Sequence, residues 1–165
     1  MRRDSVVAIV EALNGGQVRY LIVGGLAVVA HGYVRFTADV DLILSMEPQN
    51  LRRAVEALTR LAYRPRAPVV FDEFLDATKR REWAQKKNMT VFSLFSESHQ
   101  ATEVDVFLEP PIDFDIAYAR AFHQEVAPAT TATFCSLQDL IKLKTLSGRP
   151  EDEADIAKLK ELGKE

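Results

Sequence analysis

Two aspartates lie two positions apart in the segment Asp39-Val40-Asp41, where an apolar alternation typical of a β-strand begins. Successive side chains of a strand point to opposite faces of the sheet, so Asp39 and Asp41 are expected on the same face. Two neighbouring carboxylates repel each other unless a cation binds both, and hard divalent ions such as Mg²⁺ or Mn²⁺ prefer carboxylate oxygens. The pair therefore predicts a divalent metal site that stays open to substrate phosphates.

A glycine pair, Gly24-Gly25, separates a predicted strand at residues 20–23 from a predicted helix at residues 25–33. Glycine has no Cβ, so a phosphate can approach the backbone there, and the helix beyond offers free N–H groups. Taken alone, such a pair is as often only a tight turn, and D-x-D is as often a solvated strand end. Their occurrence in this order favours a phosphate site beside a metal site.

The order of these residues resembles a known family signature. G-G followed by R-x-T-x-D-x-D, here Arg35, Thr37, Asp39 and Asp41, is similar to the signature of the DNA polymerase β-like nucleotidyltransferase superfamily, and most of all to its minimal nucleotidyltransferases. The resemblance implies a nucleotidyltransferase fold. It also implies a third carboxylate, on a neighbouring strand, that completes the metal site.

Asp105 meets this requirement. Residues 89–95 and 104–108 are strand-like runs joined by a polar turn, as in a hairpin. On the second run Glu103 and Asp105 share one face, so a carboxylate stands mid-strand where an apolar residue would be expected. An unpaired buried carboxylate is costly, and coordination of a metal with Asp39 and Asp41 removes that cost.

A second motif lies near the C-terminus. L-I-x-x-K ending at Lys144, then G-R-P-x-D-x-x-D over residues 148–155, resembles the C-terminal signature of the abortive-infection (Abi) branch of minimal nucleotidyltransferases. The family commonly has lysine where this chain has Glu151, a departure that should not affect the metal site. The resemblance implies that Lys144 or Arg149 balances phosphate charge. We expect Lys144 to lie outside the core and Lys142 to point elsewhere.

The activity implied by the resemblance is transfer of a nucleoside monophosphate from an NTP to an acceptor hydroxyl, with release of pyrophosphate. Asp39 and Asp41 would hold the metal at the triphosphate, and Asp105 would join them in holding a second metal that lowers the pKa of the acceptor hydroxyl. Gly24 and Gly25 would bind the outer phosphates.

The acceptor remains open at this point. The resemblance further implies a toxin of a toxin–antitoxin pair, with tRNA or another RNA as acceptor and a cognate antitoxin as partner. A small-molecule acceptor would use the same three acids. The alternative class is a non-catalytic protein that binds a nucleotide or a partner with the same fold, and the intact set of three acids argues against it.

Composition is consistent with one globular domain. The 165 residues are 47% hydrophobic and 27% charged, which predicts a single globular domain. The resemblance implies that this is a nucleotidyltransferase domain, 1–165, with a core at 17–110 and a helical part at 136–165. The formal charge of −3 argues against polyanion binding by the chain as a whole. A single cysteine excludes a disulfide framework, and no apolar run is long enough to span a membrane, so we expect a cytoplasmic protein.

The predicted fold class is α/β (α+β): a short, mixed, twisted sheet with helices on one side, and a C-terminal helix pair that closes the nucleotide cleft. Helices are predicted at 3–14, 48–61, 114–122, 137–147 and from Pro150 onward. Residues 64–100 show no pattern that is diagnostic of the family. Basic residues around Trp83 predict either a nucleic-acid surface or, because acidic residues are interspersed, a solvated helix face with one packed tryptophan. The latter is favoured.

Overall fold

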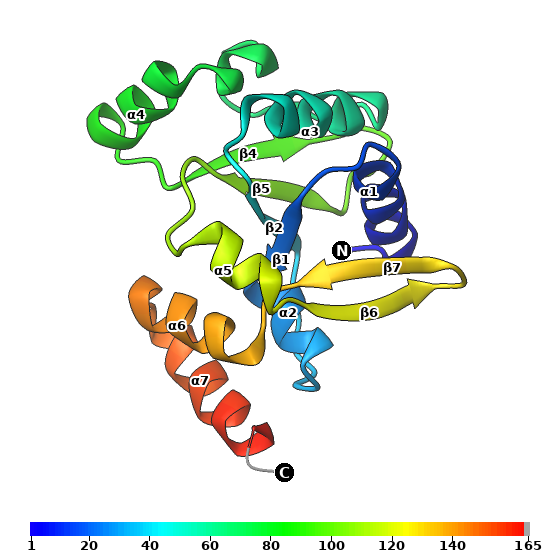
Figure 1. The fold of residues 1–165 in the computed structure, drawn as a ribbon, viewed down its shortest axis with the longest axis vertical. Helices are drawn as coiled ribbons and strands as arrows, with labels where there is room; N and C mark the ends of the chain where they lie inside the picture. The colour runs from blue at the N-terminus through cyan, green and yellow to red at the C-terminus, as the bar shows by residue number, and fades with distance from the viewer. Residues whose placement is uncertain (164–165) are drawn as a thin grey trace.

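A computed structural model describes residues 1–163 and shows a mixed α/β fold (Figure 1). Within those residues the helices are α1 (Arg3–Gly15), α2 (Gly24–Ala30), α3 (Pro48–Arg60), the 3-10 helix η1 (Phe71–Leu75), α4 (Ala77–Lys86), α5 (Phe114–Ala119), α6 (Leu137–Ser147) and α7 (Pro150–Leu162). The strands are β1 (Tyr20–Val23), β2 (Asp39–Leu44), β3 (Arg64–Pro65), β4 (Val91–Phe95), β5 (Glu103–Phe107), β6 (Phe122–Ala127) and β7 (Thr130–Phe134).

All of these strands form one mixed sheet in the order β3-β4-β5-β2-β1-β7-β6. β2 pairs antiparallel with β1 and parallel with β5, and β4 pairs antiparallel with β5. β1 also pairs parallel with β7, which forms a hairpin with β6. The predicted mixed α/β class is therefore confirmed, and the two strands that carry the predicted acids lie side by side at the centre.

Local sequence signals account for the helices near the site. Pro48 begins α3 in the first turn, where the missing N–H costs nothing. The Ser136 hydroxyl accepts a hydrogen bond from the backbone N–H of Asp139 and so caps α6. Gly148, at φ +63°, ends α6 in the left-handed conformation and leads into α7, which packs against α6 (Figure 1).

Strands β4 and β5 have one open face. On β4 and β5 buried residues alternate strictly with half-buried ones, so one face is covered and the other is not. Every residue of β1 is buried, so both of its faces are covered. The expectation of helices on one side of the sheet thus holds for β4 and β5. It is wrong for β1, because α2, which begins at Gly24, also packs on β1 and β2.

The middle segment contains two short elements that the sequence did not indicate, β3 and η1, and one helix, α4, that the favoured interpretation of the residues around Trp83 includes. Trp83 of α4 is buried, and its ring stacks on Phe92 with a centroid separation of 5.1 Å. The packed-tryptophan interpretation is therefore confirmed. Arg80 does not belong to a solvated face, because its side chain is buried and its Nη1 donates to the carbonyl oxygen of Phe74 at 2.6 Å.

The predicted helix at 114–122 ends at Ala119, because Phe122 begins β6 and pairs with Phe134. In the part of the chain that the structure describes, no helix is both long and apolar enough to cross a membrane.

Candidate active site

Three aspartates lie on one face of the two central strands. The parallel register of β2 and β5 places Asp41 beside Asp105 and Asp39 beside Glu103. Neighbouring strands are about 4.8 Å apart, so the carboxylates of adjacent partners can approach one another closely. All three aspartates are half-buried, whereas Val40, between the β2 pair, is fully buried. Sequence reasoning therefore identified the residues that the fold brings together.

The site concentrates negative charge. Burial, together with the neighbouring carboxylates of Asp105 and Asp39, raises the pKa of Asp41 to about 7. Burial likewise raises the pKa of Asp39, with further contributions from Asp105 and Glu103. A carboxyl group whose pKa is raised by like charges gains the most from a bound cation, because the cation removes the repulsion that favours the protonated form.

Carboxylate oxygens suit Mg²⁺ or Mn²⁺, and Asp39, Asp41 and Asp105 are the residues that would hold such an ion. Their side chains do not converge on one point: among residues 1–163, no three Asp, Glu, His or Cys side chains already form a group that could hold a metal. Asp41 and Asp105 are register partners on adjacent strands, so binding of one ion by both would require a change of their side-chain rotamers.

Gly24 and Gly25 lie against the site in a way that the sequence did not predict. Gly24 has φ +64°, and a Cβ there would lie 2.0 Å from Oδ2 of Asp41. A Cβ on Gly25 would lie 2.6 Å from Oγ1 of Thr37. The glycines therefore leave room for Asp41 and Thr37. This observation links the two parts of the first motif physically, because a side chain at either glycine would displace a residue of R-x-T-x-D-x-D.

Lys144 occupies a different environment from the one expected. It is only 6% exposed, and its Nζ lies 2.7 Å from both Asp152 and Asp155, which are also buried. The expectation that Lys144 lies outside the core is wrong, because two acids of α7 close over it. Burial raises the pKa of Asp152, but hydrogen bonds from Lys144, Ser147 and the Arg149 backbone, together with the charge of Lys144, lower the pKa overall.

The same ion cluster joins the two sequence motifs. The guanidinium of Arg35 pairs with Asp155, which also pairs with Lys144. Arg35 belongs to the first motif, whereas Lys144 and Asp155 belong to the second. The cluster therefore fixes α6 and α7 to the segment that leads into β2.

Arg149 is exposed where α6 turns into α7, and its backbone N–H donates to Asp152 Oδ2 at 3.3 Å. Arg149 and Lys144 both act to lower the pKa of Asp41, which burial and the neighbouring acids nevertheless keep raised. The positive charges of the second motif thus stabilise the ionised form of an acid in the first motif. Of the two predicted cations, Arg149 is the one whose side chain is free to contact a ligand.

Sequence reasoning did not assign Glu103 and Arg66 to the site. Glu103 is the register partner of Asp39, and Arg66 Nε donates to Glu103 Oε2 at 2.9 Å. The position of Glu103, two residues before Asp105, is a signal that could have included it. Arg66 carried no such signal, because it reaches the site only through the pairing of β3 with β4, far along the chain.

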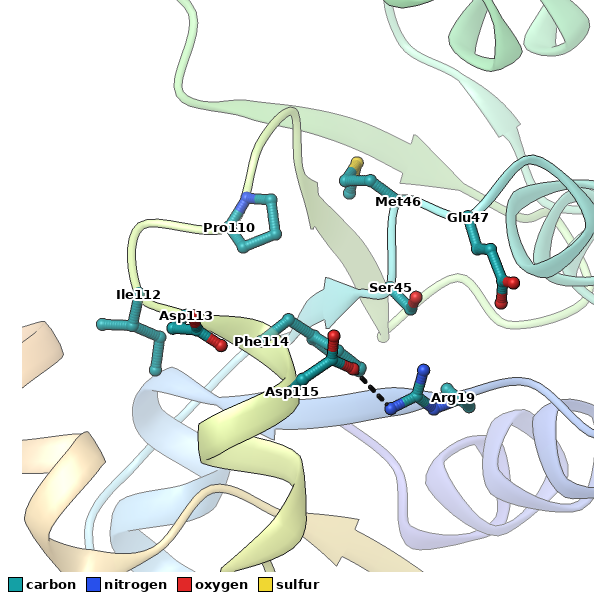
Figure 2. Close-up of a pocket in the computed structure, with 9 residues that line it drawn as sticks. All are labelled: Arg19, Ser45, Met46, Glu47, Pro110, Ile112, Asp113, Phe114 and Asp115. Atoms are coloured by element: carbon teal, nitrogen blue, oxygen red, sulfur yellow. Dashed lines mark hydrogen bonds and ion pairs between the residues drawn. The ribbon is translucent and has the colours of Figure 1, made fainter.

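A separate cavity lies at the other end of β1 and β2 (Figure 2). It has a volume of about 590 Å³, and Arg19, Ser45 and Phe114 are among its lining residues. Arg19 pairs with Asp115 at 2.6 Å and lies over the ring of Phe114. None of the predicted site residues lines this cavity, so the acids lie on an open sheet face outside it.

His31, to which the sequence assigned no role, is a packing residue between α2 and β6 and β7. Its Nε2 lies 2.9 Å from the carbonyl oxygen of Cys135, and its ring packs against Phe122.

No family model matches the chain, and no curated protein matches its sequence. The function of the site is therefore inferred from its residues and their geometry.

Proposed function

We propose that the protein is a metal-dependent nucleotidyltransferase, which transfers a nucleoside monophosphate from an NTP to an acceptor hydroxyl. The observation that carries the proposal is the juxtaposition of Asp41 with Asp105 on one side and Gly24 on the other. Three acids and a glycine turn, predicted from separate parts of the sequence, lie on adjacent elements, and this arrangement supports the proposal.

In the proposed reaction, the acceptor oxygen forms a bond to the α-phosphorus of the NTP. The bond from the α-phosphorus to the bridging oxygen of the β-phosphate breaks, pyrophosphate leaves, and the hydroxyl proton passes to solvent. Divalent metal ions bound by the three aspartates would supply charge neutralisation and lower the pKa of the acceptor hydroxyl. Asp39 and Asp41 orient the triphosphate end, and Asp105 faces the acceptor.

The remaining residues balance charge and hold the geometry. An NTP carries about four negative charges, and the site already contains three aspartates, so further cations favour binding. Arg149 is exposed and supplies one. Lys144 contributes through the electrostatic field of the buried cluster. Gly24 and Gly25 hold the geometry, because they leave room for Asp41 and Thr37.

The reaction type is tested with NTPs labelled at different phosphates. A nucleotidyltransferase transfers the label of an α-phosphate to an acceptor in a cell extract, whereas a kinase transfers the label of a γ-phosphate. We expect α-label transfer that requires Mg²⁺ or Mn²⁺ and is lost in Asp41→Asn, a substitution that conserves shape. Transfer of the γ-label, or α-label transfer that persists in Asp41→Asn, would contradict the proposal. An RNA acceptor and a cognate antitoxin stay predictions from the resemblance.

A further inference from the structure

Four carboxylates, one more than the proposed metal site uses, lie on the same face of β2 and β5. Asp39 is the register partner of Glu103, and Asp41 is the partner of Asp105. All four residues are half-buried, whereas the residues between them on each strand are fully buried. Side chains at alternate positions of a strand share a face, so the four acids form two neighbouring rows of two.

Glu103 differs from the three aspartates because a cation is bound to it. The guanidinium of Arg66 donates from Nε to Oε2 of Glu103 at 2.9 Å and from Nη2 to Oε1, so both carboxylate oxygens accept from the same group. In the part of the chain that the structure describes, none of the three aspartates takes part in an ion pair. A bidentate arginine–carboxylate pair fixes the geometry of the carboxylate as well as neutralising its charge.

Arg66 is held in place from the neighbouring strand. Its backbone N–H donates to the carbonyl oxygen of Ser93 at 3.0 Å, and Ser93 is the register partner of Asp105. Its guanidinium carbon lies 5.3 Å from the centroid of the Phe95 ring. Stacking on an aromatic ring orients the plane of a guanidinium. The side chain of Arg66 therefore reaches Glu103 across β4 from a fixed backbone.

The charges of this pair act on the proposed metal site. Burial and the charge of Asp105 raise the pKa of Asp39, and among the smaller contributions Glu103 raises this pKa while Arg66 lowers it. A positive charge beside the site repels a bare divalent ion and attracts a polyphosphate, whereas a free carboxylate does the opposite. Whether Glu103 is paired or free therefore bears on which ligand the site prefers.

We propose that Arg66 is a positioning residue that holds Glu103 out of the metal site, so that the site prefers a metal–nucleotide complex to a bare divalent ion; this inference rests on the proposed function. A fourth free carboxylate beside Asp39 would bind the bare ion more tightly, because it adds an oxygen ligand and a negative charge. The same charge would repel the complex of an NTP with one Mg²⁺, which still carries about two negative charges. Pairing with Arg66 removes both effects.

The test is calorimetric titration with Mn²⁺ alone and with a non-hydrolysable NTP analogue premixed with Mn²⁺. The variant R66Q keeps a long polar side chain but removes the charge. We expect R66Q to bind Mn²⁺ alone at least about threefold more tightly and the metal–nucleotide complex at least about threefold more weakly, with both shifts reduced at high salt. Loss of structure would weaken both affinities, so it cannot produce two shifts of opposite sign.

Two further variants make the test specific. R66Q/E103Q removes both charges of the pair and should return both affinities to within about twofold of the unmodified chain. R64Q is the matched control, because Arg64 lies 4.9 Å from the same Phe95 ring but pairs with Glu97 instead, and it should change neither affinity.

Three results would overturn the inference. The first is an R66Q variant whose affinity for Mn²⁺ alone is unchanged or weaker. The second is an R64Q variant that shifts both affinities as much as R66Q does. The third is weaker Mn²⁺ binding by R66Q/E103Q than by the unmodified chain, because Glu103 would then bind the ion while Arg66 is present.

The proposed function is assessed separately by transfer of α-label. If the unmodified chain transfers the label but R66Q shows neither shift, the transferase function stands and the role of Arg66 is wrong. If the variants show the expected shifts but the unmodified chain transfers no label, the preference for the metal–nucleotide complex is supported and the transferase function fails. If the unmodified chain neither binds an analogue nor transfers label, both are wrong.

Discussion

At the scale of single residues, the surroundings of Asp41 destabilise the ionised form of its carboxyl group. Its pKa of about 7 lies well above the ordinary value of about 4 for an exposed aspartate. Between these two pH values the folded chain keeps a proton that the unfolded chain has lost. The free energy of unfolding of the metal-free protein therefore falls as the pH rises from about 4 to about 7.

This linkage predicts that Asp41→Asn stabilises the metal-free protein at pH 8. Asparagine cannot ionise, so it avoids a cost of roughly 1–3 kcal/mol that the carboxylate bears there, and it brings no comparable gain at pH 4. Denaturant unfolding with a chelator at both pH values measures this difference. Asp72→Asn, at an exposed aspartate outside the site, is the control. A variant that is less stable than the unmodified protein at pH 8 would contradict the raised pKa that burial and the neighbouring carboxylates give Asp41.

Gly24 is a second residue at which a substitution is expected to change both stability and ligand binding. At φ +64° with Oδ2 of Asp41 only 2.0 Å from the position of a Cβ, alanine brings both backbone strain and displacement of the carboxylate. We expect Gly24→Ala to lower the unfolding free energy by roughly 1–3 kcal/mol and to weaken binding of metal and NTP. Gly15→Ala, where no heavy atom lies within 4 Å, should change neither quantity for the worse. Equal NTP affinity in both variants would refute a close fit between Gly24 and Asp41.

At the scale of elements, the cluster of Lys144, Asp152, Asp155 and Arg35 decides how the C-terminal helices meet the sheet. Removing Lys144 would leave two buried carboxylates without their shared cation. Breaking a buried pair in this way typically costs roughly 3–5 kcal/mol.

Lys144→Ala is accordingly expected to lower the unfolding free energy by roughly 3–5 kcal/mol, measured by urea unfolding. Lys142→Ala removes an exposed lysine from the same helix and should stay within about 0.5 kcal/mol of the unmodified chain. Should Lys144→Ala retain full stability and lose only NTP affinity, Lys144 would act as the exposed phosphate ligand that the motif alone implies.

Local patterns predicted most elements but not the ones made by distant pairing. Alternation in β2 and β5 and the caps of α6 and α7 are properties of neighbouring residues, so they are visible in the sequence. β3 has two residues and exists only because Arg64 and Pro65 pair with β4, about thirty residues later. The burial of Lys144 likewise depends on acids of another helix, and helical periodicity cannot reveal it. The acids of the site were predictable because each lies within a regular strand.

At the scale of the whole molecule, two sequence motifs converge on one open sheet face. The first supplies Asp39, Asp41 and the glycine turn, and the second closes on it through the ion cluster. Between them in the sequence lies the hairpin that contributes Asp105. The fold thus brings together residues from most of the chain, and the proposed site is centred on the acids and not on the cavity of Figure 2.

The most direct test of this account is calorimetric titration of the protein with Mg²⁺ and a non-hydrolysable NTP analogue. The account predicts binding that requires the metal, is weakened by at least about tenfold in Asp41→Asn and in Asp105→Asn, and is unchanged in Asp72→Asn. If Asp41→Asn binds the metal–nucleotide complex as tightly as the unmodified chain does, the three aspartates do not form the nucleotide site and the assignment is wrong.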